Sequence, residues 1–225
     1  MSKPSVSRKI DSNHAPFLFF LKGIFMGRSH IKPIEQPDEV TCGPAAIKLA
    51  LAVLGKRRSL GTLVTLSKTN RNGTSTRNMI AAMNKLGLSV LAVEYATLHH
   101  LQSALRYPPN HIRAVMVAYL NALDDNDEPH PESGHWAVVA SYMASKSRIV
   151  LLDSYSGKKR SFDWQDFRGR WMDYDLKRRK VTKRGRKFRL VRRWQQQLML
   201  VVAKDAALLP RFTISTAKLF LPTEP

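Results

Sequence analysis

Apolar positions recur with a helical period through the first half of the chain. From Ile47 to Leu54 they fall on one helical face, and Gly55 follows where a left-handed residue commonly ends a helix. The same period recurs three more times, each time after a Ser or Thr that can cap a first turn. The pattern therefore predicts four short helices, starting near Cys42, Ser59, Thr74 or Ser75, and Thr97, with one short strand over 88–93.

Beyond Pro108 and Pro109 the apolar period changes from 3.6 to 2, which is typical of strands. A short helix or turn with aromatic anchors is expected over 162–171. A helical half followed by strands indicates an α+β fold, because the two kinds of element are segregated along the chain. The predicted strands cover residues 114–120, 136–142, 148–152 and 197–203.

Two of these strands form a predicted hairpin around a polar turn at 144–145. In an antiparallel pair, a residue just before the first strand and one just after the second meet at the open end. That geometry places His135 and Asp153 side by side, or within a residue or two, and about 5 Å apart if they are directly opposed. The spacing predicts an imidazole next to a carboxylate.

The chain is strongly basic, with a formal net charge of +20. Residues 158–193 alone hold sixteen Lys or Arg against four Asp. Such a segment suits an anionic partner, namely an acidic polypeptide, nucleic acid or a membrane surface, although it also suits a solvated, solubilising extension. Gly185 near the middle of the run 177–193 indicates a protruding hairpin.

The two ends of the chain are expected to lie outside a central domain. The apolar run 17–26 is half the length needed to span a bilayer and contains Lys22, so it is interpreted as packing on the domain, with a membrane-surface anchor as the alternative. It also lacks a small-residue cleavage site. The division expected is an arm over 1–30, a domain over 31–204 with a basic hairpin at 172–193, and a peripheral tail over 205–225.

Cys42 is the only cysteine among 225 residues, and it stands where the first helix begins. One cysteine forms no intrachain disulfide and no cysteine-cluster metal site, so a reducing, cytoplasmic compartment is expected. The N–H groups and the dipole at a helix N-terminus favour the thiolate over the thiol. The alternative is a buried cysteine that packs as a small apolar residue.

Three other polar residues are candidates to join Cys42 in a catalytic site. His135 would take the thiol proton and later protonate the leaving group, and Asp153 would orient the His135 ring. Gln36 could donate its amide to an oxyanion, with the backbone N–H of Cys42 as the second donor. Each residue also has an ordinary structural interpretation, and His130 with His135 makes only a weak metal pair. No cofactor or metal is expected.

Four motifs follow one another along the chain, namely Gln36 with Cys42-Gly43-Pro44-Ala45-Ala46, the turn 72–75 before the helix ending at 85–88, the run 134–139, and the run 151–157. Their order resembles the C39 peptidase family and C39-like papain-fold domains, over roughly Ile34 to Trp171. The resemblance implies a papain-like fold in which helices carrying Cys42 pack on an antiparallel sheet carrying His135 and Asp153. It also implies that Cys42 is the nucleophile, His135 the base, Asp153 the orienting residue and Gln36 the oxyanion donor. Thr41 and Ser154 depart from the acidic residue and the proline common at those positions.

The function expected is a cysteine peptidase that cleaves a peptide or amide bond through a thioester at Cys42, or a relative that transfers the acyl group. The alternative is a catalytically silent C39-like scaffold whose basic segment, 158–193, binds nucleic acid or an acidic partner. Arg and Lys interleaved with Phe188 and Trp194 favour the nucleic-acid version of that alternative.

Overall fold

The computed structural model describes residues 30–106, 108, 111–181 and 187–222. The apolar run at 17–26, for which packing on the domain was predicted, lies outside them. None of the helices in this described part has the length and apolar character that crossing a membrane requires.

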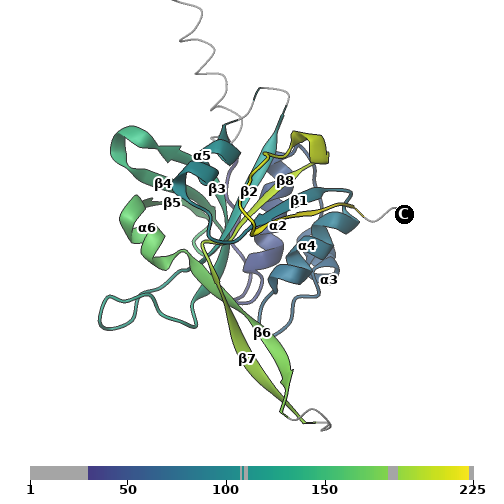
Figure 1. Cartoon of the computed structure of the whole chain (residues 1–225), viewed down its shortest axis with the longest axis vertical. Coiled ribbons are helices and arrows are strands. Elements are labelled where there is room, and N and C mark those ends of the chain that lie inside the picture. The colour runs from purple at the N-terminus through teal and green to yellow at the C-terminus, as the bar shows by residue number, and fades with distance from the viewer. Residues whose placement is uncertain (1–29, 107, 109–110, 182–186, 223–225) are drawn as a thin grey trace, which may run out of the picture.

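A seven-stranded, fully antiparallel sheet forms the centre of the molecule, in the order β5-β4-β3-β2-β8-β1-β9 (Figure 1). Its middle strand, β2, is buried along its whole length. This burial agrees with the continuous run of apolar residues at 114–120, because a strand covered on both faces needs apolar side chains on both faces. The strands are β1 (Ser89–Val93), β2 (Arg113–Leu120), β3 (Gly134–Met143), β4 (Arg148–Asp153), β5 (Lys158–Asp163), β8 (Met199–Ala203) and β9 (Ala217–Phe220).

Helices cover both faces of this sheet. On one face α2 (Cys42–Val53) contacts β2 and β3, and α3 (Leu60–Leu66) and α4 (Thr76–Lys85) pack beside it. On the other face α5 (Leu98–Leu105) and α6 (Trp164–Arg170) cover a second apolar core rich in aromatic rings. The α+β architecture is therefore confirmed as helices packed on an antiparallel sheet.

The helices begin and end where their capping residues predict. The side chains of Ser59, Ser75 and Thr97 accept hydrogen bonds from backbone N–H groups in the first turns of α3, α4 and α5. After α2 and α4, Gly55 and Gly87 adopt positive φ angles of 69° and 71°. These local signals act within a few residues, so they can be read without knowing the fold.

Two edge strands were not predicted. β5 runs through Lys158 and Arg160, where we expected only a basic segment, and β9 adds a strand from the tail that was expected to be peripheral. Both lie at the edges of the sheet, and most of their residues are exposed or only partly buried. An edge strand needs little apolar alternation and tolerates charge, which removes the sequence signal for it.

The β3–β4 hairpin contains a bulge at Ala140. Next to the turn, Tyr142 pairs with Ile149 and Ser141 with Val150, whereas beyond the bulge Val139 pairs with Leu151 and Val138 with Leu152. The extra residue in β3 shifts the register by one position. Because side chains alternate between faces, a shift of one residue moves everything beyond it to the opposite face of the pairing.

A second, two-stranded sheet leaves the body of the molecule as a long ribbon (Figure 1). It consists of β6 (Met172–Lys180) and β7 (Phe188–Gln196). Its base contacts β2 and β3, and its outer residues are almost all exposed. The described residues of the basic run, 177–181 and 187–193, thus lie along this hairpin.

Candidate active site

Cys42 is the first residue of α2 and is 6% exposed. Thr41 at the N-cap makes no side-chain capping bond, so the first N–H groups of α2 have no side-chain acceptor from that residue. These groups and the helix dipole favour a negative charge at the position of the thiol. The arrangement suits a thiolate and also an oxyanion formed next to it.

His135 lies near the start of β3, and Asp153 is the last residue of β4. The Nε2 atom of His135 is 3.2 Å from Oδ1 of Asp153, and both side chains are almost fully buried. The distance is that of an ion pair, although the angle at the ring nitrogen falls short of a hydrogen bond. Because Nε2 of His135 faces Asp153, Nδ1 is the ring nitrogen that remains for the thiol of Cys42.

Burial and neighbouring charge compete in setting the pKa of His135. Burial lowers it, but contact with Asp153 and the interaction with Cys42 outweigh this effect and raise the pKa from 6.5 to about 9. For Asp153, burial raises the pKa, and the interactions with His135, Tyr119 and the Tyr155 N–H lower it to about 2. At neutral pH the pair is thus an imidazolium beside a carboxylate.

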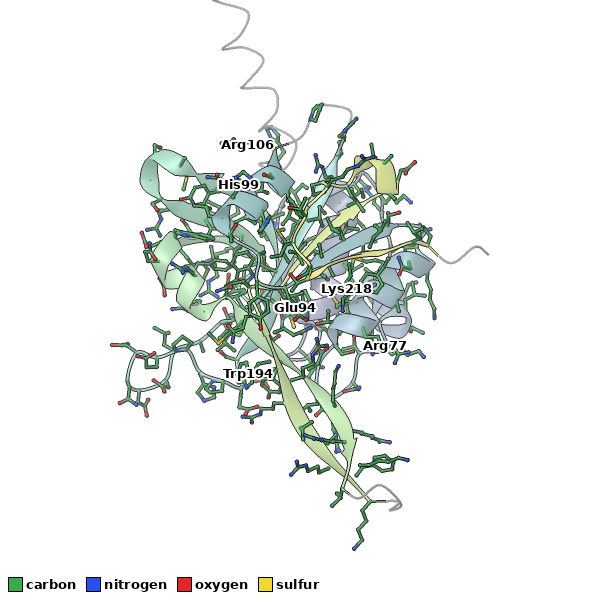
Figure 2. The ribbon with its side chains drawn as sticks, viewed as in Figure 1. Arg77, Glu94, His99, Arg106, Trp194 and Lys218 are labelled. Carbon is green, nitrogen blue, oxygen red and sulfur yellow. The ribbon has the colours of Figure 1, made fainter. Side chains whose placement is uncertain are left out.

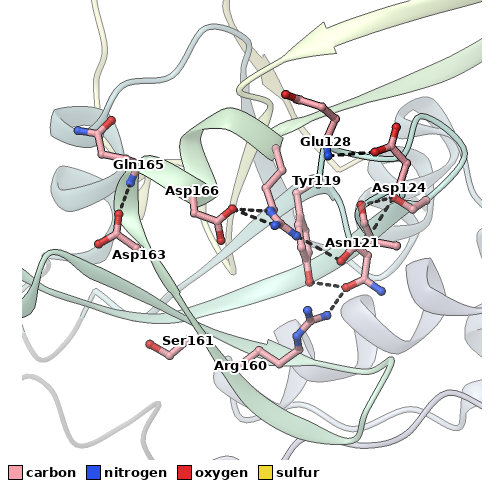
Figure 3. A network of polar contacts seen from close by, with 12 residues as sticks. Tyr119, Asn121, Asp124, Glu128, Arg160, Ser161, Asp163, Gln165 and Asp166 are labelled. Atoms are coloured by element: carbon pink, nitrogen blue, oxygen red, sulfur yellow. Dashed lines mark hydrogen bonds and ion pairs between the residues drawn. The ribbon is translucent and has the colours of Figure 1, made fainter. Parts of the chain in front are cut away.

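Asp153 is held by two further side chains that the sequence did not reveal. The Tyr119 hydroxyl donates to Oδ2 of Asp153 at 2.6 Å, and Nη1 of Arg160 lies 3.3 Å from the same oxygen. Tyr119 and Arg160 also meet at the side chain of Asn121 (Figure 3). The Tyr119 ring packs edge-on against the His135 ring, with 5.6 Å between centroids. These contacts fix the carboxylate in its charged state and orient it.

The hydrogen bonds of Gln36 fix the orientation of its side-chain amide. Nε2 donates to the carbonyl of Asp38 at 2.7 Å, and Oε1 accepts from the Ser154 hydroxyl at 2.9 Å. Because a carbonyl only accepts, the amide nitrogen must be the atom that faces Asp38. The Gln36 backbone N–H also donates to the Ser154 carbonyl. Gln36 is thereby tied to the residue after Asp153 and to the loop that leads into Cys42.

Gly43 permits a close approach between α2 and the loop before α4. A Cβ at this position would lie 2.6 Å from Cβ and Oγ1 of Thr74, and no side chain can be accommodated there without movement. Thr74 in turn accepts a hydrogen bond at its carbonyl from Nε1 of Trp136. The neighbour that requires a glycine at this position is thus Thr74 of the protein itself.

Cys42 opens onto a cavity of about 540 Å³. The cavity runs over the loop 70–76 and the start of α4 to the base of the β6–β7 hairpin. Its lining is acidic although the chain is basic. One basic residue, Arg71, and four acidic residues line it. The acidic residues are Glu39, Glu132, Asp173 and Asp175.

Three of the four residues expected at the site interact with one another, and the fourth is anchored near them by hydrogen bonds to Asp38 and Ser154. His135 interacts with both Cys42 and Asp153. Gln36 contacts Asp38 and Ser154, and one of its two amide hydrogens remains for another acceptor. In the described part of the chain no three His, Cys, Asp or Glu side chains gather as metal ligands do.

The fold and the site define a papain-like architecture with a thiol, an imidazole and a carboxylate in interaction. The chain belongs to the Peptidase C39 family, whose model matches residues 30–182. That family consists of cysteine peptidases. No curated protein matches the chain.

The solved structures that are similar to this chain include the following three. The peptidase domain of Streptococcus ComA, a bi-functional ABC transporter involved in quorum sensing, is 19% identical, with 77% of this chain and 98% of that domain covered and a TM-score of 0.55. A double glycine motif protease from an AMS/PCAT transporter, in complex with its leader peptide, is 15% identical, covers 63% of this chain and 86% of its own, and scores 0.47. The Streptococcus mutans ComA peptidase domain is 17% identical, with 77% and 99% covered and a score of 0.45. At 19% identity, the likeness to the Streptococcus ComA peptidase domain shows the fold.

Proposed function

We propose that this protein is a cysteine peptidase that hydrolyses a peptide or amide bond through a thioester at Cys42. His135 is its base and acid, and Asp153 orients His135. The observation that carries the proposal is the position of His135, which interacts with the thiol of Cys42 and with the Asp153 carboxylate. A reducing, cytoplasmic setting suits a catalytic thiol of this kind.

The first half of the reaction forms the thioester. The Cys42 thiolate attacks the carbonyl carbon of the scissile bond, and the negative charge moves to the carbonyl oxygen. The Cys42 N–H and the free amide hydrogen of Gln36 donate to that oxygen. The imidazolium of His135 then gives its proton to the leaving nitrogen as the C–N bond breaks. An amine leaves and an acyl group remains on sulfur.

The second half releases the acid. His135, now neutral, takes a proton from a water molecule that attacks the thioester carbonyl. The C–S bond breaks, the carboxylic acid departs and the Cys42–His135 pair returns to its starting state. Transfer of the acyl group to an amine in place of water would follow the same steps, with the amine as the attacking group.

Alkylation of the full-length protein with an iodoacetamide probe tests the proposal directly. Cys42 is the only cysteine, so all labelling reports on this residue. We expect labelling at neutral pH to be at least about tenfold faster than that of glutathione, and His135→Ala to remove the advantage. Labelling no faster than glutathione in the wild type, with no response to His135→Ala, would contradict a catalytic role.

Nucleic-acid binding by the β6–β7 hairpin is a second candidate function. The observation that favours it is the exposure of Phe188 and Trp194 among the Arg residues of β7, since base stacking uses aromatic rings next to cations. An electrophoretic mobility shift with single-stranded DNA, repeated at rising salt, tests it. Absence of any shift at low salt would exclude it.

A further inference from the structure

A second cavity, of about 870 Å³, adjoins the one that begins at Cys42. It lies between α4, the sheet edge formed by β1 and β9, and the base of the β6–β7 hairpin. The two cavities share four lining residues, Ser75, Thr76, Asp175 and Leu176. A chain that occupies the first cavity can therefore continue into the second without leaving the surface of the protein.

The sign of charge reverses between the two cavities. Carboxylates dominate next to Cys42, whereas five cations line the second cavity against Glu94 and Asp175. Figure 2 shows Arg77, Glu94 and Lys218 on this side of the molecule, above the base of the hairpin. The five cations are Arg77, Lys177, Arg178, Arg193 and Lys218.

Among the described residues, only one of these five cations has a carboxylate oxygen within 4 Å. Arg193 lies 3.3 Å from Glu94. For the other four, no ion pair within 4 Å exists among the residues that the structure describes, and all four side chains are exposed. Clustered like charges repel one another, so an anionic occupant lowers the energy of the folded protein.

The second cavity also presents apolar surface. Leu176 is 40% exposed, Phe220 is partly buried, and Ala81 on α4 is exposed. These side chains lie among the cations and offer contacts to aliphatic groups. The combination suits a ligand that carries negative charge and apolar side chains in alternation.

We propose that this second cavity is an exosite that binds an acidic segment of the substrate polypeptide, in which apolar side chains are interspersed. The inference rests on the proposed peptidase function, because the occupant is the continuation of the chain held at Cys42. Charge complementarity and the shared lining residues identify this occupant. A sugar-phosphate backbone fits less well, because it carries no aliphatic side chains to contact Leu176, Phe220 and Ala81.

Binding of a fluorescein-labelled peptide of glutamate, leucine and alanine to the full-length Cys42→Ala protein tests the exosite without catalysis. We expect saturable binding that weakens as salt rises. Arg77→Glu combined with Lys218→Glu should weaken binding about tenfold, since both reversals place a carboxylate against the peptide. Neither residue belongs to the β6–β7 hairpin, so nucleic-acid binding there should persist.

A matched control variant reverses two positive charges outside both cavities. Lys204→Glu combined with Arg211→Glu changes two exposed cations that line neither cavity, and binding should change less than about twofold. A peptide with glutamine in place of glutamate should bind at least about tenfold more weakly. Equal loss in both double variants, or equal binding of the glutamine peptide, would show non-specific attraction and overturn the exosite.

Single-stranded DNA of matched charge is the competitor that separates the two kinds of partner. If DNA displaces the peptide and its own binding falls equally in the Arg77→Glu/Lys218→Glu variant, the cavity is a nucleic-acid site and the proposal is wrong. The outcomes for the proposed function remain separate. If the peptide binds but Cys42 is unreactive, the cavity is a binding site and the proposed peptidase function is wrong. If Cys42 is reactive but the peptide does not bind, only the exosite proposal is wrong.

Discussion

His135 and Asp153 meet on a diagonal of the β3–β4 hairpin. Continuing the register of Val138 with Leu152 places Asp153 opposite Ala137, two residues from His135 and on the same face. Their contact of 3.2 Å therefore depends on the side chains reaching along the strand. Sequence spacing predicted the pair to within this offset.

The pKa of His135 should report this contact. We expect the ring in the wild-type protein to titrate near pH 9, because the contact with Asp153 and the interaction with Cys42 outweigh burial. Since the folded pKa is raised, the stabilisation is complete below about pH 6.5 and is lost as the pH rises through about 9. Asp153→Asn should lower the midpoint by more than about one pH unit, measured by NMR of ¹⁵N-histidine. Asp125→Asn, an exposed carboxylate, serves as the control and should leave it unchanged.

Tyr119→Phe should impair catalysis without unfolding the protein. The change removes the hydroxyl that donates to Asp153 at 2.6 Å and keeps the buried ring. A hydrogen bond to a charged group contributes about 1.5–3 kcal/mol, so a loss of roughly tenfold to a hundredfold in the acylation rate is expected. The midpoint of His135 should shift as well, which a purely structural role would not cause. Tyr142→Phe, whose hydroxyl contacts only Ser147 in the described structure, should change neither quantity.

Gln36 and Ser154 should act as one unit. Gln36→Ala removes the proposed oxyanion donor, so acylation of Cys42 by p-nitrophenyl acetate should slow about a hundredfold. Ser154→Ala removes the bond that orients the amide of Gln36, and a smaller loss of about tenfold is expected. The double variant should be no slower than Gln36→Ala alone. Strictly additive losses would show that Ser154 does not act through Gln36.

Gly43→Ala should destabilise the fold. The added methyl would lie 2.6 Å from the side chain of Thr74, so the loop or the helix must move. Overpacking of this kind typically costs about 1–3 kcal/mol, which thermal unfolding detects. Gly61→Ala is the matched control, because nothing lies within 4 Å of its added Cβ and it sits in α3, where alanine is preferred by about 0.5–1 kcal/mol. An equal effect of the two substitutions would contradict the close approach.

Asp173→Asn should remove a pH dependence of stability. Burial is the largest effect on this carboxyl group and raises its pKa from 3.8 to about 7. The folded state therefore holds the proton more tightly than the unfolded state, and stability falls as the pH rises from about 4 to about 7. Asparagine should flatten this slope, measured by urea unfolding at pH 4.5 and pH 8. Asp125→Asn should leave the slope intact.

The sequence predicted the parts of the fold that depend on near neighbours. Capping residues such as Ser75 and the glycine at 87 mark helix ends through contacts within one turn. The edge strands β5 and β9 escaped prediction although β5 forms a hairpin with the adjacent β4, whereas β9 pairs with the distant β1. A strand at an edge has half its hydrogen bonds and little apolar burial, so its local pattern is weak.

The same distinction applies to the candidate site. Cys42, His135, Asp153 and Gln36 were predicted from residue type and spacing. Tyr119 is an aromatic residue within an apolar strand, and Arg160 is one of many cations in a basic segment. Only the pairing of β2 with β3 and of β4 with β5 brings both to Asp153. A composition signal could not have separated Arg160 from its basic neighbours.

The bulge at Ala140 makes the contact between His135 and Asp153 depend on the register of the hairpin as well as on residue type. If the register beside the turn continued without it, Asp153 would lie opposite Val138 and point to the face away from His135. A regular ladder that kept every residue of β3 would thus separate the carboxylate from the imidazole, although every residue of the site stayed in the sequence. The contact between His135 and Asp153 therefore depends on where β3 bulges as well as on which residues the two strands carry.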